Sequence, residues 1–144
     1  MDNMLFYAHS GLRFLVLLSG AIAAAVLLWG WRSGRPLAGQ SRAATAVFVG
    51  TLDLQILLGI ATVLTGPWYG ALMGHLVMMI AAAIAAHGIT AYGRKQADAR
   101  RAHLVTLVGV VLALLLILGG IMSIRSNPFQ MTPGASGATA TSAA

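Results

Sequence analysis

Residues 102–124 read AHLVTLVGVVLALLLILGGIMSI and contain no Asp, Glu, Lys or Arg. A helix that crosses a membrane needs about 20 consecutive, mostly apolar residues, so this run alone is long enough to span a bilayer. Three further apolar runs of similar character precede it, at residues 4–29, 43–65 and 71–92. The pattern therefore predicts four transmembrane helices.

The composition of the chain points the same way. Of its 144 residues, 58% are hydrophobic and 8% are charged, whereas a soluble domain carries about 25% charged residues. This composition excludes an ordinary soluble globular domain and a disordered chain. The sequence has no cysteine, which excludes disulfides, iron–sulfur clusters, thiolate catalysis and covalently attached haem within it.

The basic residues predict an orientation. The connections at residues 31–42 and 93–101 hold seven of the nine Lys and Arg residues, and the connection GPWYG at 66–70 holds none. Basic residues gather in the cytoplasmic loops of membrane proteins. We therefore expect a multi-pass protein of the bacterial cytoplasmic (inner) membrane with both termini outside. The lipid bilayer is then its surroundings, and no nucleic-acid partner is expected.

Short connections make consecutive helices antiparallel neighbours. The predicted fold is therefore all-α, an integral membrane up-down-up-down four-helix bundle formed by residues 1–125. Residues 126–144 are mostly small and polar and include Gly and Pro, and we expect a flexible outer C-terminal tail. The alternative is that this tail lies on a partner subunit.

Two histidines are placed at one level of the predicted bundle. At a rise of about 1.5 Å per residue, His9 and His75 lie on the order of 6–7 Å below the outer ends of the first and third helices. Those helices are diagonal in an up-down bundle, so the two imidazoles could ligate a haem iron from opposite sides. The alternatives are polar anchors or subunit contacts, a copper ion, or a quinone headgroup.

Two further side chains belong to this candidate site. The guanidinium of Arg13 matches a carboxylate as a two-pronged donor, which suits a haem propionate. Met79 lies four residues after His75 and shares its helix face, so it could serve haem or Cu(I). The alternative for Met79 is flexible apolar packing.

His87 and His103 form a second and weaker candidate pair for a haem iron. The spacing of 12 residues turns His87 about 120° away from His75 on a regular helix, which disfavours two stacked haems. The alternative for His87 and His103 is a snorkelling or packing role.

Asp53 and Gln55 are predicted to be buried polar groups of the second helix. A carboxylate at mid-membrane needs protonation, a partner or water, and we expect a buried ion pair between Asp53 and Arg13. The functional alternative is a proton-relay or quinone-site carboxylate. Gln55 lies about 200° around the helix from Asp53, so the two cannot face the same site.

Three strings resemble segments of a known family, the small bacterial four-helix membrane proteins labelled cytochrome b-like. YAHSGLRF at 7–14 resembles the family opening H-S-x-L-R-[WF]. DLQILLG at 53–59 is similar to H-L-Q-L-L-[IL]-G, and GHLVMM at 74–79 is similar to E-H-x-x-M-M. Together they span the first three predicted helices.

Five residues match the family pattern, namely His9, Arg13, Gln55, His75 and Met79. Two depart from it, because Asp53 stands where the family often has His, and Gly74 where it often has Glu. The resemblance implies haem binding in a four-helix membrane fold. If the family's histidine at the place of Asp53 is a haem ligand, this chain lacks that ligand.

The sequence thus favours a b-type cytochrome-like electron-transfer membrane subunit. It would hold one bis-His haem b near the outer leaflet and pass electrons between quinol and an outer acceptor. A quinone is a second candidate cofactor. Other membrane subunits are its expected partners. The alternatives are a non-redox accessory or structural transmembrane subunit of a larger respiratory or photosynthetic complex, and a small transporter that uses Asp53.

Overall fold

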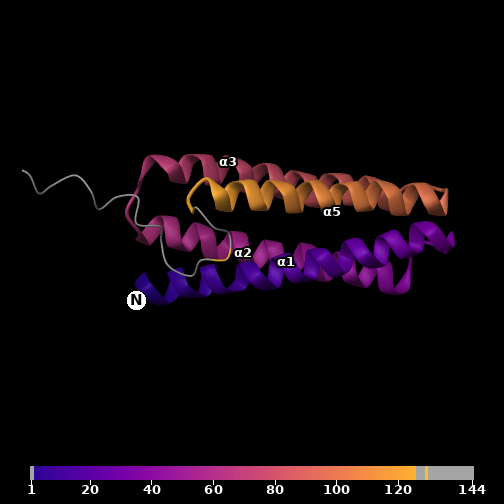
Figure 1. Cartoon of the computed structure of the whole chain (residues 1–144), viewed down its shortest axis with the longest axis horizontal. Coiled ribbons are helices and arrows are strands. Elements are labelled where there is room, and N and C mark those ends of the chain that lie inside the picture. The colour runs from indigo at the N-terminus through magenta and orange to yellow at the C-terminus, as the bar shows by residue number, and fades with distance from the viewer. Residues whose placement is uncertain (1, 126–128, 130–144) are drawn as a thin grey trace, which may run out of the picture.

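Four long helices lie side by side along the molecule (Figure 1). The computed structural model describes residues 2–125 and residue 129, and within this part it contains helices and no strands. The elements in chain order are α1 (Asp2–Ser33), α2 (Gly39–Thr65), α3 (Gly70–Ile84), η1 (Ala85–Ile89), α4 (Thr90–Arg94) and α5 (Ala99–Met122). The elements α3, η1 and α4 run on as one rod, Gly70–Arg94.

The apolar runs located all four helices, and the polar flanks set their ends. α1 continues past its apolar run to Ser33 and stops at Gly34, whose φ of 65° lies in the left-handed region that favours glycine. α5 begins after Asp98, whose Oδ1 accepts a hydrogen bond from the backbone N–H of Arg101 at 2.7 Å. This N-cap satisfies a donor that the first turn of a helix leaves without an intrahelical partner.

The helices form two layers, α1 with α2 and α3 with α5 (Figure 1). α1 also packs along α5, whereas α2 and α3 touch only sparsely, and α1 and α3 are not among the closely packed pairs. The core between the layers is apolar. Its buried residues are Val16, Ala23, Leu27, Phe48, Leu52, Ala82, Ala85, Ala86, Val110, Ala113, Ile117 and Ile121.

Many large apolar side chains lie on the outside of the bundle. All four helices are long and apolar enough to cross a membrane. Leu57, Ile80 and Leu115 are each more than 60% exposed, and many other large apolar side chains are also exposed. A soluble monomer rarely exposes so much contiguous apolar surface, so this surface requires lipid or protein to cover it.

The third rod departs from a regular α-helix at η1, where five residues form a π-helical turn. α5 packs closely against this turn, as Gly109 shows: a Cβ there would lie 2.9 Å from Cβ of Ile89. Thr90 Oγ1 donates to the carbonyl oxygen of Ala86 inside the widened turn. Since His87 lies within η1, the angle between His75 and His87 that a regular helix gives does not apply.

The predicted C-terminal tail, residues 126–144, lies outside the described residues except for Phe129. The ring of Phe129 stacks on the ring of Phe14 in α1, with the two centroids 6.4 Å apart and an interplanar angle of 16°.

Candidate functional site

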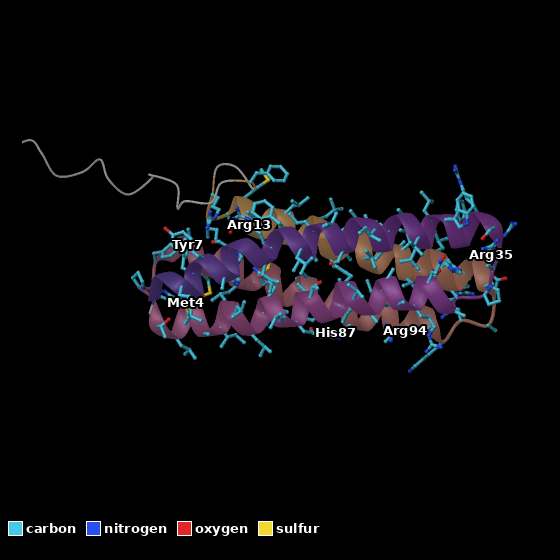
Figure 2. The ribbon with its side chains drawn as sticks, turned by 90° about the horizontal axis from the view of Figure 1, so that it is seen from below. Met4, Tyr7, Arg13, Arg35, His87 and Arg94 are labelled. Atoms are coloured by element: carbon cyan, nitrogen blue, oxygen red, sulfur yellow. The ribbon has the colours of Figure 1, made fainter. Side chains whose placement is uncertain are left out.

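The structure brings His9 and His75 together. They come from α1 and α3, and their ring centroids are 6.3 Å apart with the ring planes at 87°. Figure 2 shows the neighbouring Arg13 toward the end of the bundle that also carries Met4 and Tyr7. Two residues 66 positions apart in sequence thus share one end of the core.

Each of the two rings is oriented by a backbone carbonyl. Nδ1 of His9 lies 3.1 Å from the carbonyl oxygen of Gln55, and Nδ1 of His75 lies 2.9 Å from the carbonyl oxygen of Gly120. A carbonyl oxygen can only accept, so each Nδ1 carries the proton and each Nε2 keeps its lone pair. Metal-ligating histidines are usually held in this way, with the second ring nitrogen donating to a carbonyl or carboxylate.

The side chain of Gln55 also contacts His9. Its side-chain Nε2 donates to the carbonyl oxygen of His9 at 2.9 Å and lies 3.4 Å from Nε2 of the His9 ring. Gln55 is 7% exposed, which confirms the prediction that it is buried. Within the described residues, its Oε1 has no hydrogen-bond partner. Gly59, one turn further along α2, leaves room for the ring, because a Cβ there would lie 2.9 Å from Cε1 of His9.

Two buried arginines stand beside the histidines. Arg13 is 5% exposed and Arg125 is 7% exposed. Arg125 donates from Nη2 to Oγ of Ser10 at 3.0 Å, and burial lowers the pKa of its guanidinium from the usual value. Arg125 was missed in the sequence, although one signal was present: it is a cation directly after the fourth apolar run, at the end of the bundle that otherwise has few cations.

A small cavity of about 40 Å³ lies between these groups. Met79 contributes to its wall, as its position one turn from His75 predicts. Among the described residues, the cavity lining contains both histidines and both arginines and no carboxylate. The lining residues are His9, Ser10, Arg13, Val16, Leu52, Gln55, His75, Met79, Ile117, Ile121, Ile124 and Arg125.

Two imidazoles are a donor set that would suit a haem iron, but the free volume of about 40 Å³ is small for the macrocycle. A metal–imidazole bond is about 2 Å long, so two imidazoles on opposite sides of one metal have ring centres on the order of 6 Å apart. The observed 6.3 Å agrees with that separation. Pockets for drug-sized ligands measure about 300–1,000 Å³, so a porphyrin would have to displace some of the side chains that line this cavity.

The position of Asp53 contradicts two predictions made from the sequence. Its Oδ1 lies 2.7 Å from Nε2 of His87, so its partner is His87 and not Arg13. The predicted burial of Asp53 is also wrong, since its side chain is 47% exposed. The reason is the rotation of α2, which turns Gln55 into the core and Asp53 toward the outside. The prediction that these two residues face different sites is confirmed.

The second candidate pair, His87 and His103, is divided between two environments. His103 is fully buried, with Nε2 at 3.0 Å from Oγ of Ser41 and Nδ1 at 2.9 Å from the carbonyl oxygen of Ala99. Both of its ring nitrogens are therefore engaged by the protein. His87 is half exposed and bonded to Asp53. The structure gives the two rings different partners and leaves no shared site for a second iron.

No protein-family model, no curated protein and no solved structure matches this chain.

Proposed function

We propose that the chain is a b-type cytochrome-like electron-transfer subunit of a bacterial cytoplasmic membrane. One haem b is held by His9 and His75, and electrons pass between quinol and an acceptor on the outer side. The observation that carries the proposal is the histidine pair, whose rings are 6.3 Å apart and whose Nδ1 atoms are both occupied by backbone carbonyls.

The residues of the chain have separate roles in this proposal. Nε2 of His75 and Nε2 of His9 would hold the iron, which would replace the 3.4 Å contact of His9 with Gln55. The carbonyls of Gln55 and Gly120 hold the rings in orientation. These second bonds also raise the basicity of a ligating imidazole. Arg13 and Arg125 place positive charge on the cavity wall, which favours the carboxylates of a porphyrin. When bound, the haem supplies reversible one-electron chemistry.

The proposed topology is up-down-up-down, with both termini outside the cell membrane. Figure 2 shows Arg35 and Arg94 at the opposite end of the bundle from Met4 and Tyr7. Basic residues favour the cytoplasmic side, so the end with Arg35 and Arg94 faces the cytoplasm. His9 and His75 then lie near the outer leaflet.

A second candidate function is a non-redox accessory subunit of a larger membrane complex. The observation that favours it is the volume of about 40 Å³ beside the histidines, which has room for water but not for a porphyrin without rearrangement. In this case His9, His75 and Gln55 are interhelical ties, and the apolar helix faces bind other subunits.

A reduced-minus-oxidised visible spectrum separates the two functions. The protein is produced with ample haem, purified in detergent, and compared with the variants His9→Ala, His75→Ala and His87→Ala. We expect a b-type difference band in the native protein that is lost in the first two variants. His87→Ala is the matched control, since it removes the same ring from a half-exposed position outside the site, and it keeps the band.

Circular dichroism checks that each variant retains its helices. Absence of the band from folded native protein contradicts haem binding and favours the accessory function. A band that survives in both His9→Ala and His75→Ala contradicts the assignment of the ligands.

A further inference from the structure

The pair formed by Asp53 and His87 lies on the outer surface of the bundle. It joins α2 to η1 with a 2.7 Å hydrogen bond, and the two side chains are 47% and 51% exposed. Figure 2 shows His87 near mid-length, on the edge of the bundle and away from both ends. By helical rise, Asp53 lies on the order of 20 Å from either end of α2.

This position is costly if hydrocarbon covers it. Ionisable groups at membrane depth are expensive and normally face a protein interior, a partner group or water. The bond between Asp53 and His87 satisfies one acceptor and one donor. Among the described residues, neither the second carboxylate oxygen of Asp53 nor Nδ1 of His87 makes a hydrogen bond. The pair therefore presents one further acceptor and one further ring nitrogen to whatever covers it.

That surface is complementary to itself. Asp53 and His87 are bonded to each other, so they lie at the same depth in the bundle. A two-fold axis parallel to the helices leaves each residue at the same depth in the membrane in both copies. At such an interface, residue i of one copy contacts residue j of the other, and residue j contacts residue i. Under such an axis, Asp53 of one copy lies level with His87 of the second copy.

The surrounding helix faces have space for a second copy. Within an 18-residue apolar window of each helix, the share of buried residues is 17% in α2 and 22% in the rod Gly70–Arg94, compared with 33% and 39% in α1 and α5. Gly50, one turn before Asp53, and Gly88, next to His87, have no atom within 4 Å of where a Cβ would stand. Small residues let membrane helices approach closely, and polar side chains then bond between them.

We propose that the chain forms a two-fold homodimer through the face of α2 and the rod Gly70–Arg94. In this dimer each His87 ring is protonated on both nitrogens, so that Nε2 donates to Asp53 of its own copy and Nδ1 donates to Asp53 of the other. The interface buries both polar pairs in a four-residue cluster, and Gly50 and Gly88 allow the backbones to approach. The proposal is independent of haem binding.

Single-cysteine cross-linking in lipid tests the contact directly, because the native chain has no cysteine. Gly88→Cys places a thiol beside His87 and leaves the polar pair intact. Val108→Cys is the control, at a similar depth on the outer face of α5 and 51% exposed. We expect oxidation to give a covalent dimer with Gly88→Cys and monomer with Val108→Cys.

The mass of the native protein in detergent or nanodiscs gives the second measurement. We expect a dimer whose dissociation constant rises about tenfold in His87→Ala, since two interhelical hydrogen bonds are lost. A monomeric native protein, equal cross-linking at both cysteines, or a Gly88→Cys product with a different membrane protein would each overturn the proposal. Failure of the haem proposal leaves these outcomes unchanged, because none of them involves the spectrum.

Discussion

The two ends of the bundle use buried histidine in different ways. At one end, His9 and His75 each donate from Nδ1 to a backbone carbonyl; Nε2 of His9 has one long contact, 3.4 Å to Nε2 of Gln55, and among the described residues Nε2 of His75 has no hydrogen bond. At the other end, His103 is completely buried and uses both ring nitrogens, one toward Ser41 and one toward the carbonyl of Ala99. Burial alone does not identify a ligand. The two ends differ in how closely the protein holds Nε2: it lies 3.0 Å from Ser41 in His103 and 3.4 Å from Gln55 in His9, and in His75 it has no hydrogen bond among the described residues.

Glycine makes room for the ring at both ends. A Cβ on Gly30 of α1 would collide with the ring of His103, and a Cβ on Gly59 of α2 would lie 2.9 Å from Cε1 of His9. Helices therefore approach closely around both residues. The difference is what lies beyond the ring, since only the end with His9 and His75 places two imidazoles and two buried arginines around a common cavity.

The largest effect on stability is expected for His103→Ala. This change removes a fully buried ring and two hydrogen bonds, so we expect it to lower the free energy of unfolding by about 3 kcal/mol. Thermal unfolding in detergent measures the loss. The haem band per folded molecule should stay unchanged, because His103 is outside the proposed site. Loss of the band without loss of stability would erase the distinction between the two ends.

A smaller effect is expected for Gly59→Ala. The new methyl group overpacks against His9, which costs about 1–2 kcal/mol of stability and displaces the ring. We expect weaker or shifted haem absorbance together with a lower unfolding temperature. Gly11→Ala, in the neighbouring helix α1, is the control, since its Cβ meets nothing within 4 Å. If both variants gave the same spectrum and stability, Gly59 would not support His9.

The smallest effect is expected for Ser41→Ala. It removes one of the two hydrogen bonds of His103 and should cost about 1 kcal/mol, clearly less than loss of the ring itself. Ser33→Ala is the control, because the Ser33 hydroxyl bonds only the nearby carbonyl of Gly30 on an exposed helix end. Unfolding curves of the two variants should differ. Equal stability would show that His103 does not depend on its bond to Ser41.

The sequence predicted the helices well and the site in part. Apolar runs located all four helices, and their order placed His9 and His75 at one level. The partner of Asp53 could not be read from the sequence, since it depends on the rotation of α2 and on a π-turn around His87. Arg125 was missed because it lies after the last apolar run. The sequence does not show that the chain there contacts Ser10 of α1, which is 115 residues away.

The sequence by itself determined four long apolar helices, a basic end and a short set of polar residues within them. These features are local, because hydropathy and charge are properties of each segment. The tertiary structure alone decided that the rings of His9 and His75 lie 6.3 Å apart, that both nitrogens of His103 are occupied, and that Asp53 faces outward to His87. Those outcomes depend on how each helix rotates about its axis, and that rotation is set by the packing of all the helices together.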